Sequence, residues 1–176
     1  VNPSSDKDIF DKVKDLNKYE GLIWGGSSLN IYNDTKEIRR QIEFMKECQK
    51  RIKNILAICW GMQVAVTAAG GVVNRGKNGA HRGIAHGIVI NQDGLNHPIY
   101  KDKDKIFNTP AFNYDEVVTL PKNAILLSSN KINNVMALNF ETEFSKIWGI
   151  QYHPEITYEK MILSLIHISE PTRHES

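Results

Sequence analysis

The chain has few cysteines, no excess of charge of either sign and no long apolar run. Its 176 residues include only two cysteines, Cys48 and Cys59, which disfavours a disulfide framework and predicts a reducing, cytoplasmic setting. Lys and Arg number 22 against 20 Asp and Glu, a balance that favours neither a nucleic-acid surface nor a membrane-binding face. The longest apolar stretch, Ile55 to Ala69, is interrupted and shorter than the roughly 20 helical residues that cross a bilayer. A small molecule or another protein is therefore the expected partner.

The composition is typical of one globular domain, because 41% of the residues are hydrophobic and 24% are charged. We assign residues 1–162 to that domain. The chain opens at Val1 without a methionine, so we expect a fragment, truncated at both ends. The run from Leu163 resembles the conceptual translation of a sequencing adapter, which predicts a non-native tail over 163–176. A short native C-terminal helix is the alternative.

The first half of the chain alternates between strand and helix patterns. The order is a strand over 20–24 that ends in a glycine loop, a helix after the capping residues 33–35, a strand over 54–58 and a helix over 61–69. Cys48 falls on the apolar stripe of the first helix and is predicted to be a core residue.

The second half is predicted to be strand-rich. A polar loop over 75–83 precedes short strand-like runs over 84–91, 116–118, 124–129, 135–140 and 146–152. Strands that alternate with helices favour a parallel sheet, and hairpin-like runs favour antiparallel pairing. The predicted fold is therefore α/β, with a mostly parallel twisted sheet, helices on both faces and a small antiparallel patch.

Cys59 lies between a predicted strand and a predicted helix. A sharp turn there exposes a nucleophile, and small residues two positions away, Ala57 and Gly61, let the strand and the helix pack closely. The helix amino terminus is expected to favour thiolate and to lower the pKa of the thiol. The alternative is an ordinary core cysteine.

The last predicted strand ends at His153-Pro154-Glu155. Residues two apart in an extended chain point the same way, so the Glu155 carboxylate can reach the imidazole of His153. Nucleophile, base and orienting carboxylate form a catalytic triad on many unrelated folds. Taken alone, this motif would favour a solvated loop with an incidental ion pair, but it does not do so together with the cysteine turn.

Three segments together resemble the signatures of class I glutamine amidotransferases, in the same chain order. They are the loop 25–28 (GGSS), the run 59–63 (CWGMQ) and the run 148–155 (WGIQYHPE). The chain is similar to free-standing proteins that look like the amidotransferase domain of GMP synthase, over roughly Leu22 to Glu155. The resemblance implies a flavodoxin-like sheet that here lacks the family's first strand and much of its C-terminal helix.

The resemblance also implies roles for individual residues. Cys59 is the nucleophile, His153 its base and Glu155 the group that orients the base. The backbone N–H groups of Gly26 and Trp60 would form the oxyanion hole. Gln63 matches a glutamine-contacting residue, and it would otherwise be an exposed helix residue; the glycine pair at 25–26 would otherwise be a plain turn.

The sequence departs from the family pattern at three positions. Ala57 stands where the family usually has Gly, Asn113 where relatives often carry His, and Arg82 where close relatives tend to have Glu. Asn113 bears on how glutamine is positioned, and Arg82 on specificity. We expect no metal and no organic cofactor, because His81, His86 and His97 have no carboxylate or cysteine at ligand spacing.

The leading functional hypothesis is hydrolysis of L-glutamine to glutamate and ammonia through a glutamyl thioester on Cys59. The ammonia would pass to a synthetase on another polypeptide. A second hypothesis keeps the triad and cleaves a γ-glutamyl amide or peptide. A third is a non-catalytic module that binds glutamine or a metabolite and regulates a partner. No nucleic-acid or membrane partner is expected.

Overall fold

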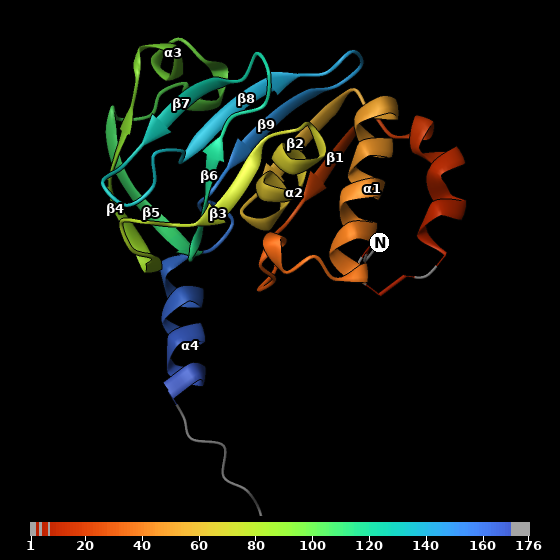
Figure 1. Ribbon diagram of the computed structural model, residues 1–176. Helices are drawn as coiled ribbons and strands as arrows, with labels where there is room; N and C mark the ends of the chain where they lie inside the picture. Colours follow the sequence, from red (N-terminus) through yellow and green to blue (C-terminus); the bar gives the residue numbers. More distant parts are fainter. Residues whose placement is uncertain (1–2, 4, 7, 170–176) are drawn as a thin grey trace, which may run out of the picture.

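A computed structural model describes residues 3, 5, 6 and 8–169 (Figure 1). The helices, with 3₁₀ helices labelled η, are η1 Ile9–Lys18, η2 Ile31–Asn33, α1 Lys36–Arg51, α2 Trp60–Ala68, α3 Gln92–Leu95, η3 Pro98–Tyr100 and α4 Tyr158–Ser169. The strands are β1 Gly21–Trp24, β2 Asn54–Ile58, β3 Val72–Arg75, β4 His81–Ile90, β5 Ile106–Asn113, β6 Asp115–Thr119, β7 Ile125–Ser129, β8 Ala137–Glu141 and β9 Lys146–Ile150. Within the described residues, no helix has both the length and the apolar character to cross a membrane. Of the predicted non-native tail over 163–176, residues 163–169 belong to α4, and residues 170–176 lie outside the described residues.

A seven-stranded sheet in the order β1-β2-β9-β8-β7-β4-β5 forms the centre of the molecule. Pairing is parallel between β1, β2 and β9 and antiparallel across the rest. The sheet is thus mixed, and the prediction of a mostly parallel sheet is corrected. Short hairpin-like connections in the second half join antiparallel neighbours, whereas parallel strands need long crossovers. A separate antiparallel pair, β3 with β6, is a small patch of the predicted kind.

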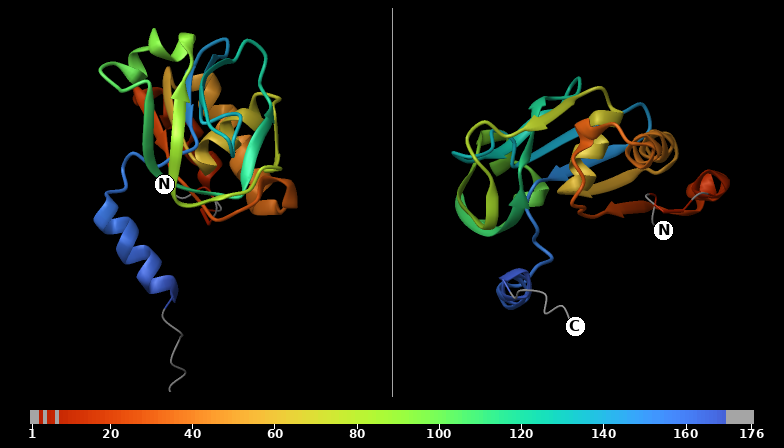
Figure 2. Two further views of the ribbon diagram at one scale, coloured as in Figure 1. Left: turned by 90° about the vertical axis from the view of Figure 1, so that its left-hand side faces the viewer. Right: turned by 60° about the horizontal axis from the view of Figure 1, so that its bottom comes forward.

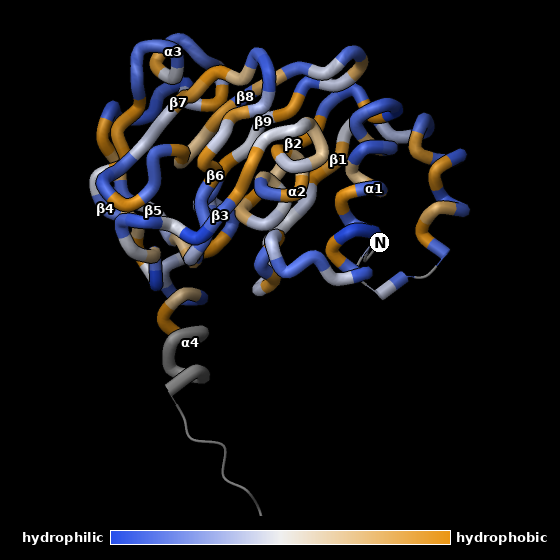
Figure 3. The backbone as a smooth tube through the Cα atoms, in the orientation of Figure 1, coloured by the Kyte–Doolittle hydropathy of each residue, from blue (hydrophilic) through white to orange (hydrophobic). Residues whose placement is uncertain are grey.

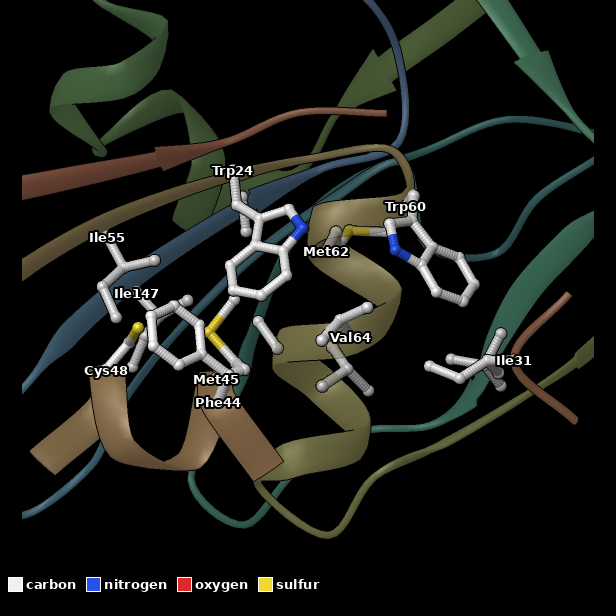
Figure 4. Close-up of a cluster of buried hydrophobic side chains, with 14 of the residues drawn as sticks. Trp24, Ile31, Phe44, Met45, Cys48, Ile55, Trp60, Met62, Val64 and Ile147 are labelled. Carbon is white, nitrogen blue, oxygen red and sulfur yellow. The ribbon is translucent and has the colours of Figure 1, made fainter. Parts of the chain in front are cut away.

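Helices α1 and α2 cover one face of the parallel strands, where the larger core lies (Figures 1 and 4). Trp24, Phe44, Met62 and Ile147 meet there. A second core lines the curled antiparallel strands and also includes Ile58 of β2, Ile150 of β9 and Tyr100 of η3, but no residue of α1, α2 or the described part of α4. Long helices therefore cover one face only, which corrects the expectation of helices on both. Figure 2 shows α4 projecting away from the sheet.

Helix α1 forms where the sequence predicted it. The Thr35 hydroxyl accepts a hydrogen bond from the Ile38 N–H at 3.4 Å and caps the amino terminus. Its apolar residues recur every three or four positions, so hydrophobic and hydrophilic segments alternate along its tube (Figure 3). Cys48 is fully buried, which confirms it as a core residue. Helix α2 ends at a left-handed glycine, Gly70 with φ of 84°.

Several elements escaped the sequence-based prediction, chiefly η1, β3 and β5. Strand β5 contains Pro110, which interrupts a strand pattern because proline lacks a backbone donor. It is tolerated here because β5 is the last strand of the sheet and has a neighbour, β4, on one side only. The predicted loop over 75–83 is shorter than expected, since Arg75 belongs to β3 and His81 to β4.

Gly61 marks the closest approach between α2 and β1. A Cβ atom at this position would lie 2.2 Å from the Trp24 carbonyl oxygen, whereas one at Gly25 would have no heavy atom within 4 Å. We expect Gly61→Ala to lower the free energy of unfolding by about 3 kcal/mol, since a backbone carbonyl cannot yield as a side chain can. Gly25→Ala, the matched control, is expected to change it by less than about 1 kcal/mol. Equal denaturation midpoints for the two variants would contradict this packing.

Candidate active site

The carboxyl ends of the three parallel strands meet at one edge of the sheet. Strand β1 leads into Gly25, β2 into Cys59 and β9 into Gln151, and β2 lies between the other two. Parallel strands bring the segments that follow them to the same edge, which is where ligands bind in open α/β sheets. The three segments that carry the family resemblance therefore converge, although Cys59 is 34 positions after Gly25 in the sequence and Gln151 is 92 positions after Cys59.

Cys59 occupies a strained turn between β2 and α2. Its φ of 54° and ψ of −109° lie outside the regions that L-residues favour. Two contacts hold the turn: the Cys59 N–H donates to the Ile150 carbonyl at 2.7 Å, and the Gly61 N–H donates to the Gly25 carbonyl at 3.2 Å. This is the strand-to-helix elbow expected from the sequence, with a buried Ala57 and a closely packed Gly61 on either side.

The thiol of Cys59 is buried and hydrogen-bonded. Its Sγ lies 3.6 Å from the Phe112 carbonyl oxygen, to which it donates, and 3.5 Å from Nε2 of Gln151, from which it accepts. Burial raises the pKa of the thiol to about 11, although the Trp60 backbone N–H acts in the opposite direction. The expectation of a lowered pKa is thus wrong, because desolvation outweighs the donors at the helix amino terminus.

His153 is held at both its backbone and its ring. Its N–H donates to the Pro110 carbonyl at 2.8 Å, and its Nδ1 lies 2.7 Å from Oε1 of Glu155. The ring of Phe112 packs against the imidazole with centroids 6.4 Å apart. A hydrogen bond at Nδ1 fixes the orientation of the ring and leaves Nε2 as the nitrogen free to exchange a proton with a substrate or a nucleophile.

Gly26 joins the two halves of the candidate site. A Cβ atom built there would lie 3.0 Å from Cε1 and 3.7 Å from Nε2 of His153, and 3.9 Å from Cβ of Cys59. The imidazole and the cysteine therefore both approach one point beside the glycine loop. Glycine is needed here because any side chain would crowd the imidazole.

Gln63 and Trp60, the remaining predicted site residues, lie on helix α2, which follows Cys59. Gln63 is 4% exposed and its Nε2 donates to Oε1 of Gln151 at 3.3 Å, so the alternative of an exposed helix residue is wrong. The Trp60 side chain is buried, and its Nε1 donates to Oε1 of Gln41 at 2.8 Å. Gln151 touches the thiol and was not singled out in the sequence. Its place two residues before His153 was the available signal.

Asn113 lies in a buried polar network next to this site. Its Oδ1 lies 3.0 Å from Nδ1 of His81, and its Nδ2 donates to the Asp115 carbonyl and to Oδ1 of Asn133. Burial lowers the pKa of His81, which favours the neutral ring. The departure at 113 is thus accommodated by satisfied hydrogen bonds, one residue away from the Phe112 carbonyl that accepts the thiol proton.

The described residues contain no group of three or more His, Cys, Asp or Glu side chains that could hold a metal ion. Surface cavities of about 520–650 Å³ are lined by other residues, such as Ala68, Phe140 and Trp148. Cys59 and His153 are 5% and 8% exposed. Access to the thiol is therefore narrow in this state.

A family model for glutamine amidotransferase class-I matches residues 2–167, and the chain belongs to that family. Among curated proteins, it is 33% identical over 145 residues to a gamma-glutamyl-L-1-hydroxyisopropylamide hydrolase from Pseudomonas sp, covering 81% of this chain and 49% of that one. It is 28% identical over 149 residues to a glutamine-hydrolyzing GMP synthase subunit from Methanosphaera stadtmanae, covering 85% and 72%.

A solved structure of a glutamine amidotransferase from Thermotoga maritima superposes with a TM-score of 0.70 at 19% identity, over 87% of this chain and 64% of that one, and so shares the fold. The chain spans about half the length of the first of its curated relatives.

The raised pKa of Cys59 predicts how the free thiol reacts with pH. Only thiolate is alkylated, and below a pKa of about 11 the thiolate fraction grows tenfold with each pH unit. We expect the rate of iodoacetamide modification at Cys59, followed by peptide mass mapping, to rise without a plateau between about pH 6 and 9. Cys48, with a pKa raised to about 12, serves as the slower internal reference. A plateau near neutral pH would reveal a thiolate–imidazolium pair instead.

Proposed function

We propose that this protein hydrolyses the amide bond of a γ-glutamyl compound through a thioester on Cys59. The observation that carries the proposal is the approach of Cys59 and His153 to one point beside Gly26, with Glu155 bonded to the far nitrogen of the imidazole. Nucleophile, base and orienting carboxylate are the parts that covalent acyl transfer requires.

The reaction begins with the thiol protonated. The bound substrate displaces the Phe112 carbonyl and Gln151 as hydrogen-bond partners of the thiol. Nε2 of His153 then accepts the thiol proton as sulfur attacks the γ-carbonyl carbon. Because the thiol is buried with a raised pKa, proton removal accompanies attack rather than preceding it. The glutamate at 155 stabilises the imidazolium that forms.

Attack produces a tetrahedral intermediate with a negatively charged oxygen. The backbone N–H of Trp60, already turned toward the sulfur, and that of Gly26 are the proposed donors to this oxygen. His153 then gives its proton to the leaving nitrogen, the C–N bond breaks, and the glutamyl group remains on sulfur. Water, deprotonated by the same imidazole, cleaves the thioester to glutamate and regenerates the thiol. Gln63 is proposed to help hold the glutamyl group.

Two substrate types fit this chemistry. Relatedness to a hydrolase named for a γ-glutamyl amide favours a substituted amide, whose leaving group is an amine. Relatedness to a glutamine-hydrolyzing GMP synthase favours glutamine, with ammonia handed to a synthetase partner. The identity is higher for the first relative, and we take a substituted γ-glutamyl amide as the primary substrate and free glutamine as the second candidate.

Steady-state assays of glutamate release with L-glutamine and with γ-glutamyl isopropylamide decide between the two. We expect a higher kcat/KM for the substituted amide. The reverse order would favour the amidotransferase function. If neither compound is turned over, and a glutamine-like diazo ketone does not label Cys59, the chain is a non-catalytic binding module and the proposal fails.

Substitutions of the three proposed catalytic residues should differ in severity. Cys59→Ala removes the nucleophile and His153→Asn the base, so each is expected to lower kcat by about 10⁴-fold or more. Glu155→Gln keeps a hydrogen-bond acceptor for the imidazole but not the charge, and a loss on the order of 10²-fold is expected because the carboxylate is half exposed. Cys48→Ala is the control. Retention of full activity by His153→Asn would exclude the proposed base.

A further inference from the structure

Two arginines lie over the exposed ring of Tyr114, close to the candidate site. Their Cζ atoms are 5.3 Å (Arg75) and 5.2 Å (Arg82) from the ring centroid, and Tyr114 is 44% exposed. An aromatic face holds a guanidinium in place while its N–H edges stay available to a planar anion. This cluster of Arg75, Arg82 and Tyr114 has no part in the proposed acyl transfer itself.

The charges of the two arginines are not equally compensated. Arg75 interacts electrostatically with the buried carboxylate of Asp115, which also accepts a hydrogen bond from the Tyr32 hydroxyl at 3.0 Å. Arg82 forms no ion pair with any residue that the structure describes, and its contact is the ring of Tyr114. Arg82 is therefore the member of the cluster whose fork of donors is open to a ligand.

The strand register places Arg82 next to Phe112, whose ring packs against His153. Arg82 of β4 is directly opposite Phe112 of β5, and opposite residues project from the same face of a sheet. Their neighbours in register, His81 with Asn113, are buried on the other face. The Phe112 ring packs on His153, so the face that carries Arg82 continues from the imidazole outward.

We propose that Arg82 binds a carboxylate carried by the leaving group, so that the site prefers γ-glutamyl amino acids or short peptides to uncharged γ-glutamyl amides. The inference rests on the proposed function, because His153 must lie at the leaving nitrogen in order to protonate it. Substituents on that nitrogen then extend past Phe112 toward Arg82. The planar guanidinium matches a carboxylate with two parallel hydrogen bonds.

Two ligands of nearly the same shape isolate the charge. γ-Glutamyl-alanine and γ-glutamyl isopropylamide differ in that a carboxylate replaces one methyl group. Isothermal titration with the Cys59→Ala variant measures both affinities without hydrolysis. The same titrations are made with Cys59→Ala proteins that carry a second substitution, which is Arg82→Gln, Arg82→Lys, Arg75→Gln or Lys14→Gln. Lys14 lies on η1, which packs on α1 at the other end of the sheet from β4 (Figure 1).

We expect the Cys59→Ala protein to bind γ-glutamyl-alanine about tenfold more tightly than the isopropylamide, a difference of about 1.4 kcal/mol. Arg82→Gln should bring the ratio of affinities close to one. Arg82→Lys should keep part of the preference, since it retains the charge but loses the fork. Arg75→Gln should reduce the ratio less than Arg82→Gln does, and Lys14→Gln should keep it. Thermal melts establish that each variant is folded.

Several results would overturn the inference. These are a ratio near one before any change at Arg82, a ratio that Arg82→Gln leaves in place, or no binding of either ligand. An equal loss for both ligands would assign the guanidinium to the glutamyl carboxylate and reject the leaving-group role. Turnover by the unaltered chain is measured separately. If the chain hydrolyses these compounds but the ratio of the two affinities does not depend on Arg82, only this inference is rejected. If the ratio depends on Arg82 but no hydrolysis is observed, the proposed catalysis is rejected and the preference for a charged ligand stands.

Discussion

The parallel pairing of β1, β2 and β9 is the constraint on which the candidate site depends. With β2 in the middle, the turn at its carboxyl end lies between the glycine loop after β1 and the segment that carries His153 after β9. The turn itself is held in an unfavourable backbone conformation by hydrogen bonds to both neighbours. Burial of Trp24, Met62 and Ile147 between the parallel strands and the helices α1 and α2 provides the free energy that stabilises this geometry (Figure 4).

The antiparallel half of the sheet supports the same site from the other side. Strand β5 accepts the backbone N–H of His153 at Pro110 and the thiol of Cys59 at Phe112. Burial of the sulfur raises the pKa of the thiol to about 11, which favours its neutral form. In the proposed mechanism, this buried thiol reacts when a substrate replaces its two hydrogen-bond partners. Burial of the Cys59 thiol and its contacts with Phe112 and Gln151 therefore limit the access of other molecules to the sulfur.

Local patterns were enough to locate α1, α2, β1, β2 and β9, and with them the residues that meet at the sheet edge. They failed where the structure depends on distant partners. Strand β5 was missed because Pro110 hides an edge strand, and the extent of antiparallel pairing was underestimated because strand order is not a local property. The predicted direction of the thiol pKa shift was wrong because the burial that raises the pKa depends on how segments distant in sequence pack together. The contact of Gln63 with Gln151 is of the same kind.

The proposed function requires that the sulfur of Cys59 and the imidazole of His153 act on the same bound substrate. A crystal structure of the protein after reaction with a glutamine-like diazo ketone tests it most directly. It should show the label on Sγ of Cys59, the label's carbonyl oxygen facing the N–H groups of Trp60 and Gly26, and Nε2 of His153 within about 3.2 Å of the adduct. A label on any other residue, or an imidazole turned away from the adduct, would contradict it.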